Sequence, residues 1–321
     1  MSRQKVTYEM KPTRFGYSEA LLALGQEDER VVVLDADLAK STTTERFKER
    51  FPERFYDVGI AEQNMLGISA GLSLAGFIPF VSTYGVFLSG RAWDQIRTTI
   101  CYAGLNVKLG GAHGGLSVGP DGATHQALEE IALTRVLPNM TVLVPADYQE
   151  TIKATRAAAA IKGPVYIRFG RAPVPIITRP EDPFVVGKAN QYREGRDVTI
   201  ISTGAMLALA LEAAENLASR GVQARILNMH TIKPLDVEAV VKAAQETGCL
   251  VTVEEHQING GLGGAVAECL VEHSPVPMER VGIRDTFGES GEPEELQESY
   301  GLTAAEIEAA ALRVYKRKGA R

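Results

Sequence analysis

The residues best suited to chemistry lie in the segment YDVGIAEQNM, from Tyr56 to Met65. A short strand runs into Gly59, and one carboxylate, Glu62, follows with two amides where a helix should begin. In an open parallel sheet, ligands bind beyond the carboxyl ends of the strands. Glu62 therefore stands where a functional acid is expected, although a carboxylate at a helix start can also serve only the helix dipole.

A second segment, LGGAHGGLSVGPDGATHQ (Leu109–Gln126), is dense in glycine and carries His113, Asp121 and His125. A loop of this length inside a compact domain is usually functional. Metal binding is one alternative, but no HExxH or CxxC spacing supports it. A purely structural loop is another. Substrate contact suits a flexible, glycine-rich loop better than either.

Several single residues add to this set. Tyr84 and Phe87 are three apart near a strand end, where they could enclose a planar heterocycle or simply belong to the core. Arg14, Ser41 and Arg168 could hold a phosphate, because a guanidinium pairs with it bidentately. The sequence NGGLGG at residues 259–264 lacks the GxGxxG spacing of a dinucleotide site, which makes a nucleotide-binding oxidoreductase improbable.

The helix after Glu62 contains the run GISAGLSLAG (Gly67–Gly76), which places two glycines inside it. Each glycine costs roughly 0.5–1 kcal/mol relative to alanine. Such a cost predicts that another backbone approaches closely, from the same chain or across a subunit interface.

The elements that position these residues follow an α/β pattern, in which short apolar runs alternate with helix-like stretches. We expect a boundary near Thr178–Pro183 and two domains, residues 1–180 and 190–321. The predicted strands are Val31–Leu34, Phe77–Val81, Val107–Leu109, Thr141–Val144, Val165–Arg168, Val198–Ser202, Ala224–Asn228, Leu250–Glu254 and Met278–Val281. The predicted helices are Ser18–Gly25, Ala61–Ala75, Ala92–Tyr102, Leu128–Thr134, Tyr148–Ile161, Met206–Arg220, Val237–Thr247, Gly263–Val271 and Ala304–Lys316.

Composition excludes several classes of protein. The 321 residues are 45% hydrophobic and 23% charged, with a formal net charge of −6. Nucleic-acid binding needs a basic face, which these numbers do not favour. No apolar run is long enough for a membrane span, and three scattered cysteines fit a reducing cytoplasm.

Taken in order, these segments resemble the pyrimidine-binding and C-terminal domains of transketolase, above all the form made as two polypeptides. The resemblance covers essentially the whole chain, and its most specific motifs are GIAEQNM (Gly59–Met65) and DGATHQ (Asp121–Gln126). It implies a thiamine diphosphate-binding, pyrimidine-type parallel-sheet domain followed by a C-terminal α/β domain.

The resemblance also implies roles for the cofactor site. Glu62 matches the catalytic glutamate that hydrogen-bonds the aminopyrimidine ring of thiamine diphosphate. Tyr84 and Phe87 match aromatics that pack around this ring. Asp37 and Leu38 match an Asp-Leu pair near the cofactor.

For the substrate, the resemblance makes Asp121 a reader of a sugar hydroxyl and places His125 near the reacting carbonyl, so that His125 and His113 are catalytic candidates beside Glu62. The residues that match holders of the substrate phosphate are Arg14, Ser41, His113 and Arg168. A third family aromatic falls on Gly90, and an acidic residue falls on Pro120. The first departure leaves the pyrimidine pocket partly open or filled by another group. The second bears on the exact substrate more than on the chemistry.

The family holds Mg²⁺ with a Gly-Asp-Gly motif in an N-terminal domain, and no GDG occurs in this chain. We therefore expect no metal ligands here. The expected partner is an N-terminal transketolase subunit that supplies Mg²⁺ or Ca²⁺, in a heterotetramer with self-association of this chain. The expected reaction moves a two-carbon ketol unit from a ketose phosphate to an aldose phosphate.

Two alternatives are open beside this interpretation. A β-type subunit of a 2-oxo acid dehydrogenase or of a 1-deoxyxylulose-5-phosphate synthase-like enzyme would share the architecture and Glu62. The predicted phosphate-holding residues argue against 2-oxo acids, which carry no phosphate. A non-catalytic module with the same fold would not need to keep Glu62 with His113, Asp121 and His125.

Overall fold

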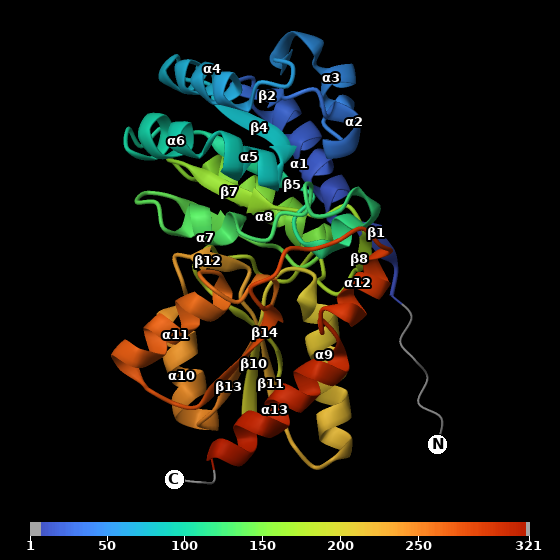
Figure 1. Ribbon diagram of the computed structural model, residues 1–321. Helices are drawn as coiled ribbons and strands as arrows, with labels where there is room; N and C mark the ends of the chain where they lie inside the picture. Colours follow the sequence, from blue (N-terminus) through green and yellow to red (C-terminus); the bar gives the residue numbers. More distant parts are fainter. Residues whose placement is uncertain (1–7, 319–321) are drawn as a thin grey trace.

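The computed structural model describes residues 8–318, so the outermost residues of both predicted domains lie outside the described part. Figure 1 shows two α/β units, one in blue and green and the other in yellow to red. The predicted α/β class with two mainly parallel sheets is confirmed within residues 8–318.

The first unit is built on a sheet in the order β12-β6-β7-β5-β4-β2-β3 over the described residues, parallel except for β12. Its strand β2 (VVVLD) is buried throughout, because helices cover both faces of the sheet. The other parallel strands end near the same edge. The bounds are β2 Val31–Asp35, β3 Phe55–Asp57, β4 Ile78–Tyr84, β5 Lys108–Ala112, β6 Thr141–Leu143 and β7 Val165–Arg168.

The alternation of side chains along β2 divides the core between two helical layers. Val31 and Val33 pack with α1, α3 and α8 on one face. Val32 and Leu34 pack with α4, α5, η2 and α7 on the other. The bounds are α1 Thr13–Glu27, α2 Ala39–Thr42, α3 Glu45–Arg50, η1 Pro52–Arg54, α4 Glu62–Leu74, α5 Gly85–Arg91, α6 Trp93–Gln95, η2 Ile96–Cys101, η3 Leu116–Asp121, α7 Glu130–Arg135 and α8 Tyr148–Ala160.

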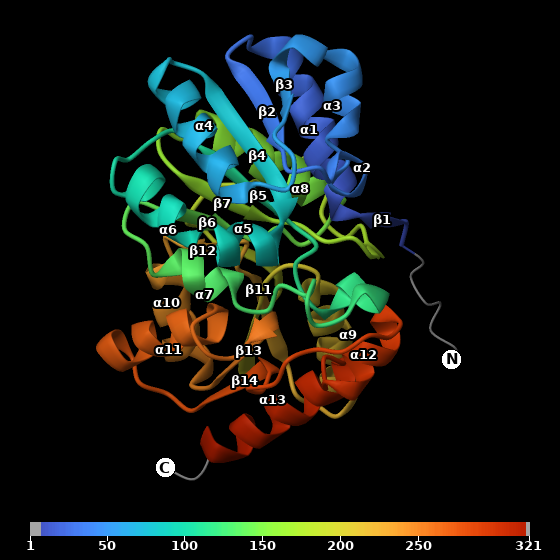
Figure 2. The same ribbon diagram turned by 45° about the horizontal axis from the view of Figure 1, so that its top comes forward.

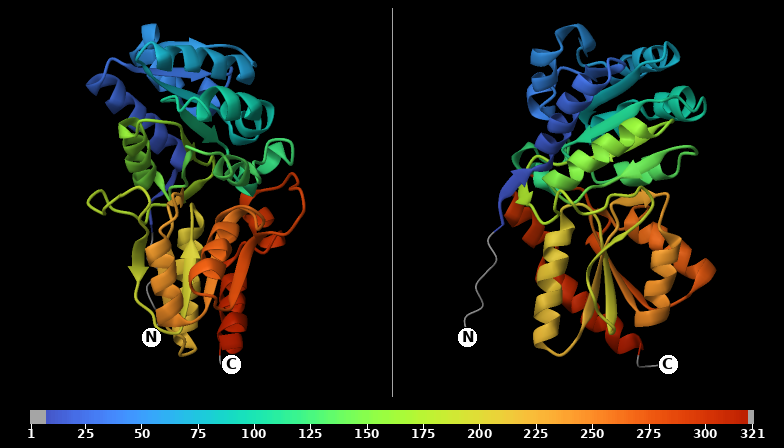
Figure 3. Two further views of the ribbon diagram at one scale, coloured as in Figure 1. Left: turned by 90° about the vertical axis from the view of Figure 1, so that its left-hand side faces the viewer. Right: turned by 180° about the vertical axis from the view of Figure 1, so that it is seen from behind.

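The second unit holds a five-stranded sheet within the described range, in the order β14-β13-β10-β11-β9, with only β9 antiparallel. Figure 3, seen from behind, shows its helices on both sides of the strands. The bounds are β9 Asn190–Arg193, β10 Val198–Ser202, α9 Met206–Ser219, β11 Ala224–Asn228, α10 Val237–Thr247, β13 Leu250–Gln257, α11 Leu262–His273, β14 Met278–Ile283, α12 Pro293–Ser299 and α13 Ala304–Lys318.

The two units share structure at their junction. Strand β12 (Thr231–Lys233) comes from the second half of the chain but pairs with β6 of the first sheet. Strands β1 (Met10–Pro12) and β8 (Pro173–Pro175) form a separate ribbon. Helix α12 packs against η3, and the two lie side by side in Figure 2. The second unit therefore supports loops at the carboxyl edge of the first sheet.

The prediction from the two helix glycines has a clear outcome within this chain. No atom of residues 8–318 outside the local helix lies within 4 Å of the point where a Cβ would stand on Gly67 or Gly71. Both glycines lie on the exposed side of α4. The prediction that another part of the described chain approaches them closely is therefore wrong. A close approach across a subunit interface stays a prediction.

The sequence places the main elements well. Four elements match residue for residue: Val165–Arg168, Val198–Ser202, Ala224–Asn228 and Val237–Thr247. The predicted helix Ala92–Tyr102 instead divides into α6 and the π-helical η2. No helix among residues 8–318 has the length and apolar character to cross a membrane.

Candidate active site

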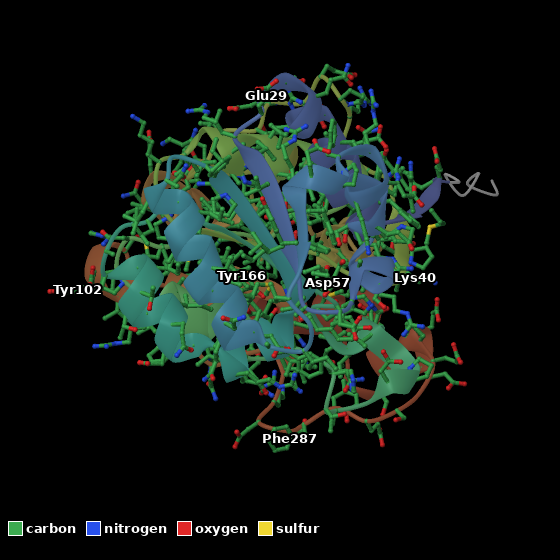
Figure 4. All side chains as sticks on the ribbon, turned by 90° about the horizontal axis from the view of Figure 1, so that it is seen from above. Glu29, Lys40, Asp57, Tyr102, Tyr166 and Phe287 are labelled. Atoms are coloured by element: carbon green, nitrogen blue, oxygen red, sulfur yellow. The ribbon has the colours of Figure 1, made fainter. Side chains whose placement is uncertain are left out.

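The parallel strands gather the candidate residues at one edge of the first sheet. Strand register pairs Asp35 with Asp57 and Tyr84 with Ala112, so the loops that follow these residues start side by side. Figure 4 shows Asp57 at the opposite end of the strands from Glu29, which precedes β2. The site is therefore built by the carboxyl ends of the strands.

Glu62 is the first residue of α4, and its side chain is only 4% exposed. The chain reaches it through Gly59, whose φ of +72° favours glycine. One carboxylate oxygen of Asp57 accepts from the N–H groups of Gly59 and Asp37, both at 3.1 Å. Asp57 thus ties the loop before Glu62 to the loop that carries Asp37.

Arg91 is the partner of Glu62. Its Nη1 donates to Glu62 Oε1 at 2.9 Å, and its guanidinium carbon lies 3.9 Å from the centre of the Phe87 ring. A hollow of about 480 Å³ opens beside this pair, lined by residues 60–64 and Arg91. The buried carboxylate of Glu62 and the half-exposed guanidinium of Arg91 therefore both border an accessible space.

A buried carboxyl fixes the loop after β2. Asp35 accepts hydrogen bonds from Leu38 N at 2.6 Å and from the hydroxyls of Thr42 and Thr44 at 2.8 Å. Burial raises the pKa of Asp35 to about 6. These contacts hold the loop that presents Asp37, Leu38 and Ser41 to the site.

Four rings form one cluster over the strand ends. Tyr84 stacks on His113 with centroids 4.0 Å apart and on Phe87 at 5.6 Å. His125 meets Tyr84 and Phe87 edge-on, at 5.8 and 5.3 Å. The predicted cofactor aromatics and both predicted catalytic histidines therefore lie together.

His113 is held neutral. Burial first, and then Arg14, Arg171 and His125, lower the pKa of His113 to about 3. Its Nδ1 is buried and has no hydrogen-bond partner within residues 8–318. A buried polar atom of this kind is costly, so a ligand atom that pairs with it would be favoured.

Two arginines lie close enough to His113 for their charges to lower its pKa. Burial, and then Arg171, lower the pKa of Arg14, whose Nη1 donates to the carbonyl of Ser41 at 2.9 Å. Arg171 forms an ion pair of 3.1 Å with Asp121. Arg14, Ser41, His113 and Asp121 are thus brought to one region, and Arg171 joins them there.

Arg168 has different surroundings from the other candidates. Its side chain is 7% exposed, and its Nε pairs with the buried carboxylate of Glu130. Its Nη2 donates to the carbonyl of Glu255 at 2.7 Å. The charge of Arg168 is therefore neutralised by Glu130, and its Nη2 links the first unit to the second.

Comparison with known proteins decides the family. Residues 9–176 match the family model "Transketolase, pyrimidine binding domain", and residues 187–307 match "Transketolase, C-terminal domain". The chain belongs to the transketolase family. It is the C-terminal section of a transketolase of the split type, with both of these domains.

Three relatives illustrate this position within the transketolases. The 6-deoxy-6-sulfo-D-fructose transketolase subunit of Clostridium sp. (strain MSTE9) is 47% identical over 95% of each chain. An apulose-4-phosphate transketolase subunit of Phocaeicola vulgatus is 40% identical, over 95% of this chain and 97% of its own. A solved structure described as "Split gene transketolase, inactive beta4 tetramer" has a TM-score of 0.90 and 51% identity, covering 96% of this chain and 99% of its own.

The candidate site contains residues that sequence reasoning did not single out. Arg171 lies three residues after Arg168 in the same RFGR run, and only the second arginine reaches the Arg14 region. Arg91 follows the aromatics in the sequence, but its pairing with Glu62 has no local signal. The roles of the predicted site residues stay predictions. Within residues 8–318, no group of three or more His, Cys, Asp or Glu side chains could hold a metal ion.

Proposed function

We propose that this chain binds the aminopyrimidine half of thiamine diphosphate through Glu62 and serves the transfer of a two-carbon ketol unit between sugar phosphates. The observation that carries the proposal is a buried carboxylate beside stacked aromatic rings, already paired with a flat cation. Glu62 holds Arg91 at 2.9 Å while Arg91 lies over Phe87.

The site residues fit the implied cofactor. A planar guanidinium donates to Glu62 while resting on an aromatic face, which is the arrangement a planar ring with a hydrogen-bond donor would need. Glu62, Phe87 and Tyr84 would hold the ring, with Asp37 and Leu38 near the cofactor. When bound, thiamine diphosphate supplies the centre that carries the ketol unit.

Glu62 has a defined task in this proposal. Its carboxylate would accept a hydrogen bond from a ring nitrogen of bound thiamine diphosphate and so hold a proton at that atom. Such a bond would be strong because the carboxylate is largely removed from water. Asp57 and the Gly59 turn position Glu62.

The substrate phosphate is assigned to Arg14, Arg171, Ser41 and His113. Arg14 and Arg171 supply cationic donors, and neutral His113 offers a buried Nδ1 that needs a partner. The role predicted for Arg168 passes to Arg171, because Glu130 already neutralises the buried Arg168. Asp121, held by Arg171, is placed to read a sugar hydroxyl, and His125 to hydrogen-bond the reacting carbonyl.

The metal and the diphosphate are assigned to an N-terminal transketolase subunit, with Mg²⁺ or Ca²⁺ held there. The exposed glycines of α4 support an interface, because they allow another backbone to approach closely. Self-association completes the proposed heterotetramer. The split relative described as an inactive β4 tetramer is consistent with a need for the other subunit.

The substrate class is a ketose with a terminal oxyanion. The relatives are named for 6-deoxy-6-sulfo-D-fructose and for apulose-4-phosphate. A pair of guanidinium groups suits a phosphate or a sulfonate, since both present several oxygens. A sulfonated ketose is therefore the second candidate substrate for this chain.

The test is reconstitution with the N-terminal-section subunit encoded by the same organism. The mixture should transfer a ketol unit from fructose 6-phosphate or from 6-deoxy-6-sulfofructose to an aldose phosphate, and neither subunit should do so alone. Turnover of pyruvate in place of these ketoses would instead favour one of the two alternatives, a 2-oxo acid dehydrogenase or a 1-deoxyxylulose-5-phosphate synthase-like enzyme. Full activity of this chain alone would overturn the assignment of metal and diphosphate to a partner.

A further inference from the structure

Arg91 makes two contacts beside Glu62. Its Nη1 donates to Glu62 at 2.9 Å, and its guanidinium lies 3.9 Å from the centre of Phe87. The Arg91 side chain is 50% exposed and that of Glu62 only 4%. One end of the ion pair is therefore fixed in the protein, and the other can move into solvent.

These contacts match what the proposed function asks of the aminopyrimidine ring. Both groups are planar, both donate a hydrogen bond to a carboxylate, and both favour an aromatic face. A ring that took the Phe87 face and Glu62 Oε1, which Arg91 now occupies, would require Arg91 to leave both.

The backbone around Arg91 allows this exchange. Gln63 Nε2 donates to the Arg91 carbonyl at 3.1 Å, which fixes the end of α5 beside α4. Gly90, immediately before it, has no atom of the described residues within 4 Å of the point where a Cβ would stand. The side chain of Arg91 can thus turn toward the open hollow of about 480 Å³ while its backbone stays in place.

We propose that Arg91 competes with the aminopyrimidine ring for the position against Glu62 and Phe87. Arg91 occupies this position in the free subunit and leaves it when the cofactor ring binds Glu62. The inference rests on the proposed function of Glu62. It explains how a buried carboxylate avoids being left unpaired before the cofactor arrives, a state that is strongly unfavourable. It also makes Arg91 a determinant of cofactor affinity.

The test measures affinity rather than activity. The assembled two-subunit enzyme, stripped of cofactor, is titrated calorimetrically with thiamine diphosphate at fixed Mg²⁺. Arg91→Ala should lower the Kd about three- to tenfold, from the loss of a half-exposed ion pair and a cation–π contact. Arg91→Lys, which keeps the charge but cannot lie flat, should fall between Arg91→Ala and the wild type. The matched control is Arg97→Ala, an exposed arginine on η2, which should bind like the wild type.

Variants in a Glu62→Gln background separate the inference on Arg91 from the proposed function of Glu62. In a Glu62→Gln background, Arg91→Ala should change the Kd by less than about twofold, because the competition requires the carboxylate. If Glu62→Gln alters cofactor binding but Arg91→Ala matches Arg97→Ala, or binds more weakly than the wild type, the inference on Arg91 is overturned. If Glu62→Gln changes neither affinity nor turnover, the proposed function itself fails.

Discussion

The side chain of Glu255 accepts a hydrogen bond of 2.7 Å from the backbone N–H of Ser117. Glu255 belongs to β13 of the second unit, and Ser117 lies in η3 of the first. A Cβ on Gly115, whose φ is +93°, would overlap the Glu255 carboxylate. The second unit therefore sets the position of the loop that leads to Asp121 and His125.

Loss of this contact should loosen the loop. Leaving the buried Ser117 N–H without its partner costs roughly 1–3 kcal/mol, so Glu255→Ala should speed amide exchange in residues 114–122 by about fivefold or more. Hydrogen exchange with mass spectrometry measures this directly. The exposed Glu181→Ala is the control. Unchanged exchange in Glu255→Ala would show that the loop is held by other contacts.

Arg171 should bind the substrate anion. Arg171→Ala removes a cation whose charge lowers the pKa of Arg14 and of His113, so the KM for a phosphorylated ketose should rise about tenfold or more. The KM for the unphosphorylated ketose erythrulose should change little. Steady-state kinetics of the reconstituted enzyme measure both, with the exposed Arg284→Ala as control. An equal rise for both ketoses would argue against a phosphate role.

Arg168 should matter for stability. Arg168→Ala leaves Glu130 buried without its cation, which should lower the free energy of unfolding by roughly 3–5 kcal/mol. Urea unfolding followed by circular dichroism checks the value. A variant as stable as the wild type, but with an impaired KM for phosphorylated ketoses only, would return the phosphate role to Arg168.

Glu150 should give the protein a pH-dependent stability. Burial raises the pKa of Glu150 from 4.5 to about 7. The folded state then binds this proton more tightly than the unfolded state, so the free energy of unfolding decreases as pH rises from about 4.5 through 7. The loss is on the order of 3 kcal/mol.

The substitution Glu150→Gln tests this pH dependence, because glutamine resembles the protonated carboxyl. Glu150 already accepts from Asn228 Nδ2 at 2.8 Å, and Asn228 Oδ1 is buried without a partner in the described chain. A rotated Asn228 amide could accept from the amide group that the substitution introduces. Urea unfolding at several pH values should show a flatter slope for Glu150→Gln and an unchanged slope for the exposed Glu212→Gln. Equal slopes in wild type and Glu150→Gln would refute the raised pKa.

Local sequence patterns were sufficient for the main strands and helices. The run VVVLD is short, β-branched and apolar, so its buried strand could be predicted without knowledge of the rest of the chain. Strands β1, β8 and β12 could not, because each has three residues and depends on a distant partner. The π-helical turn at η2 likewise has no local signal that distinguishes it from an α-helix.

In the candidate site too, some residues have a local sequence signal and others depend on distant partners. Glu62, His113 and His125 could be singled out because their motifs carry them in a fixed local order. The choice between Arg168 and Arg171 could not be made locally. It depends on Glu130, which lies 38 residues before Arg168 and neutralises it only in the folded chain.

Glu62→Gln in the reconstituted enzyme tests the central claim most directly. A glutamine cannot hold the proton on the ring nitrogen as a carboxylate does, so we predict a fall in kcat of at least about a hundredfold with an intact fold. The exposed Glu49→Gln is the matched control and should retain its turnover. A kcat for Glu62→Gln within about twofold of the wild type would contradict the account.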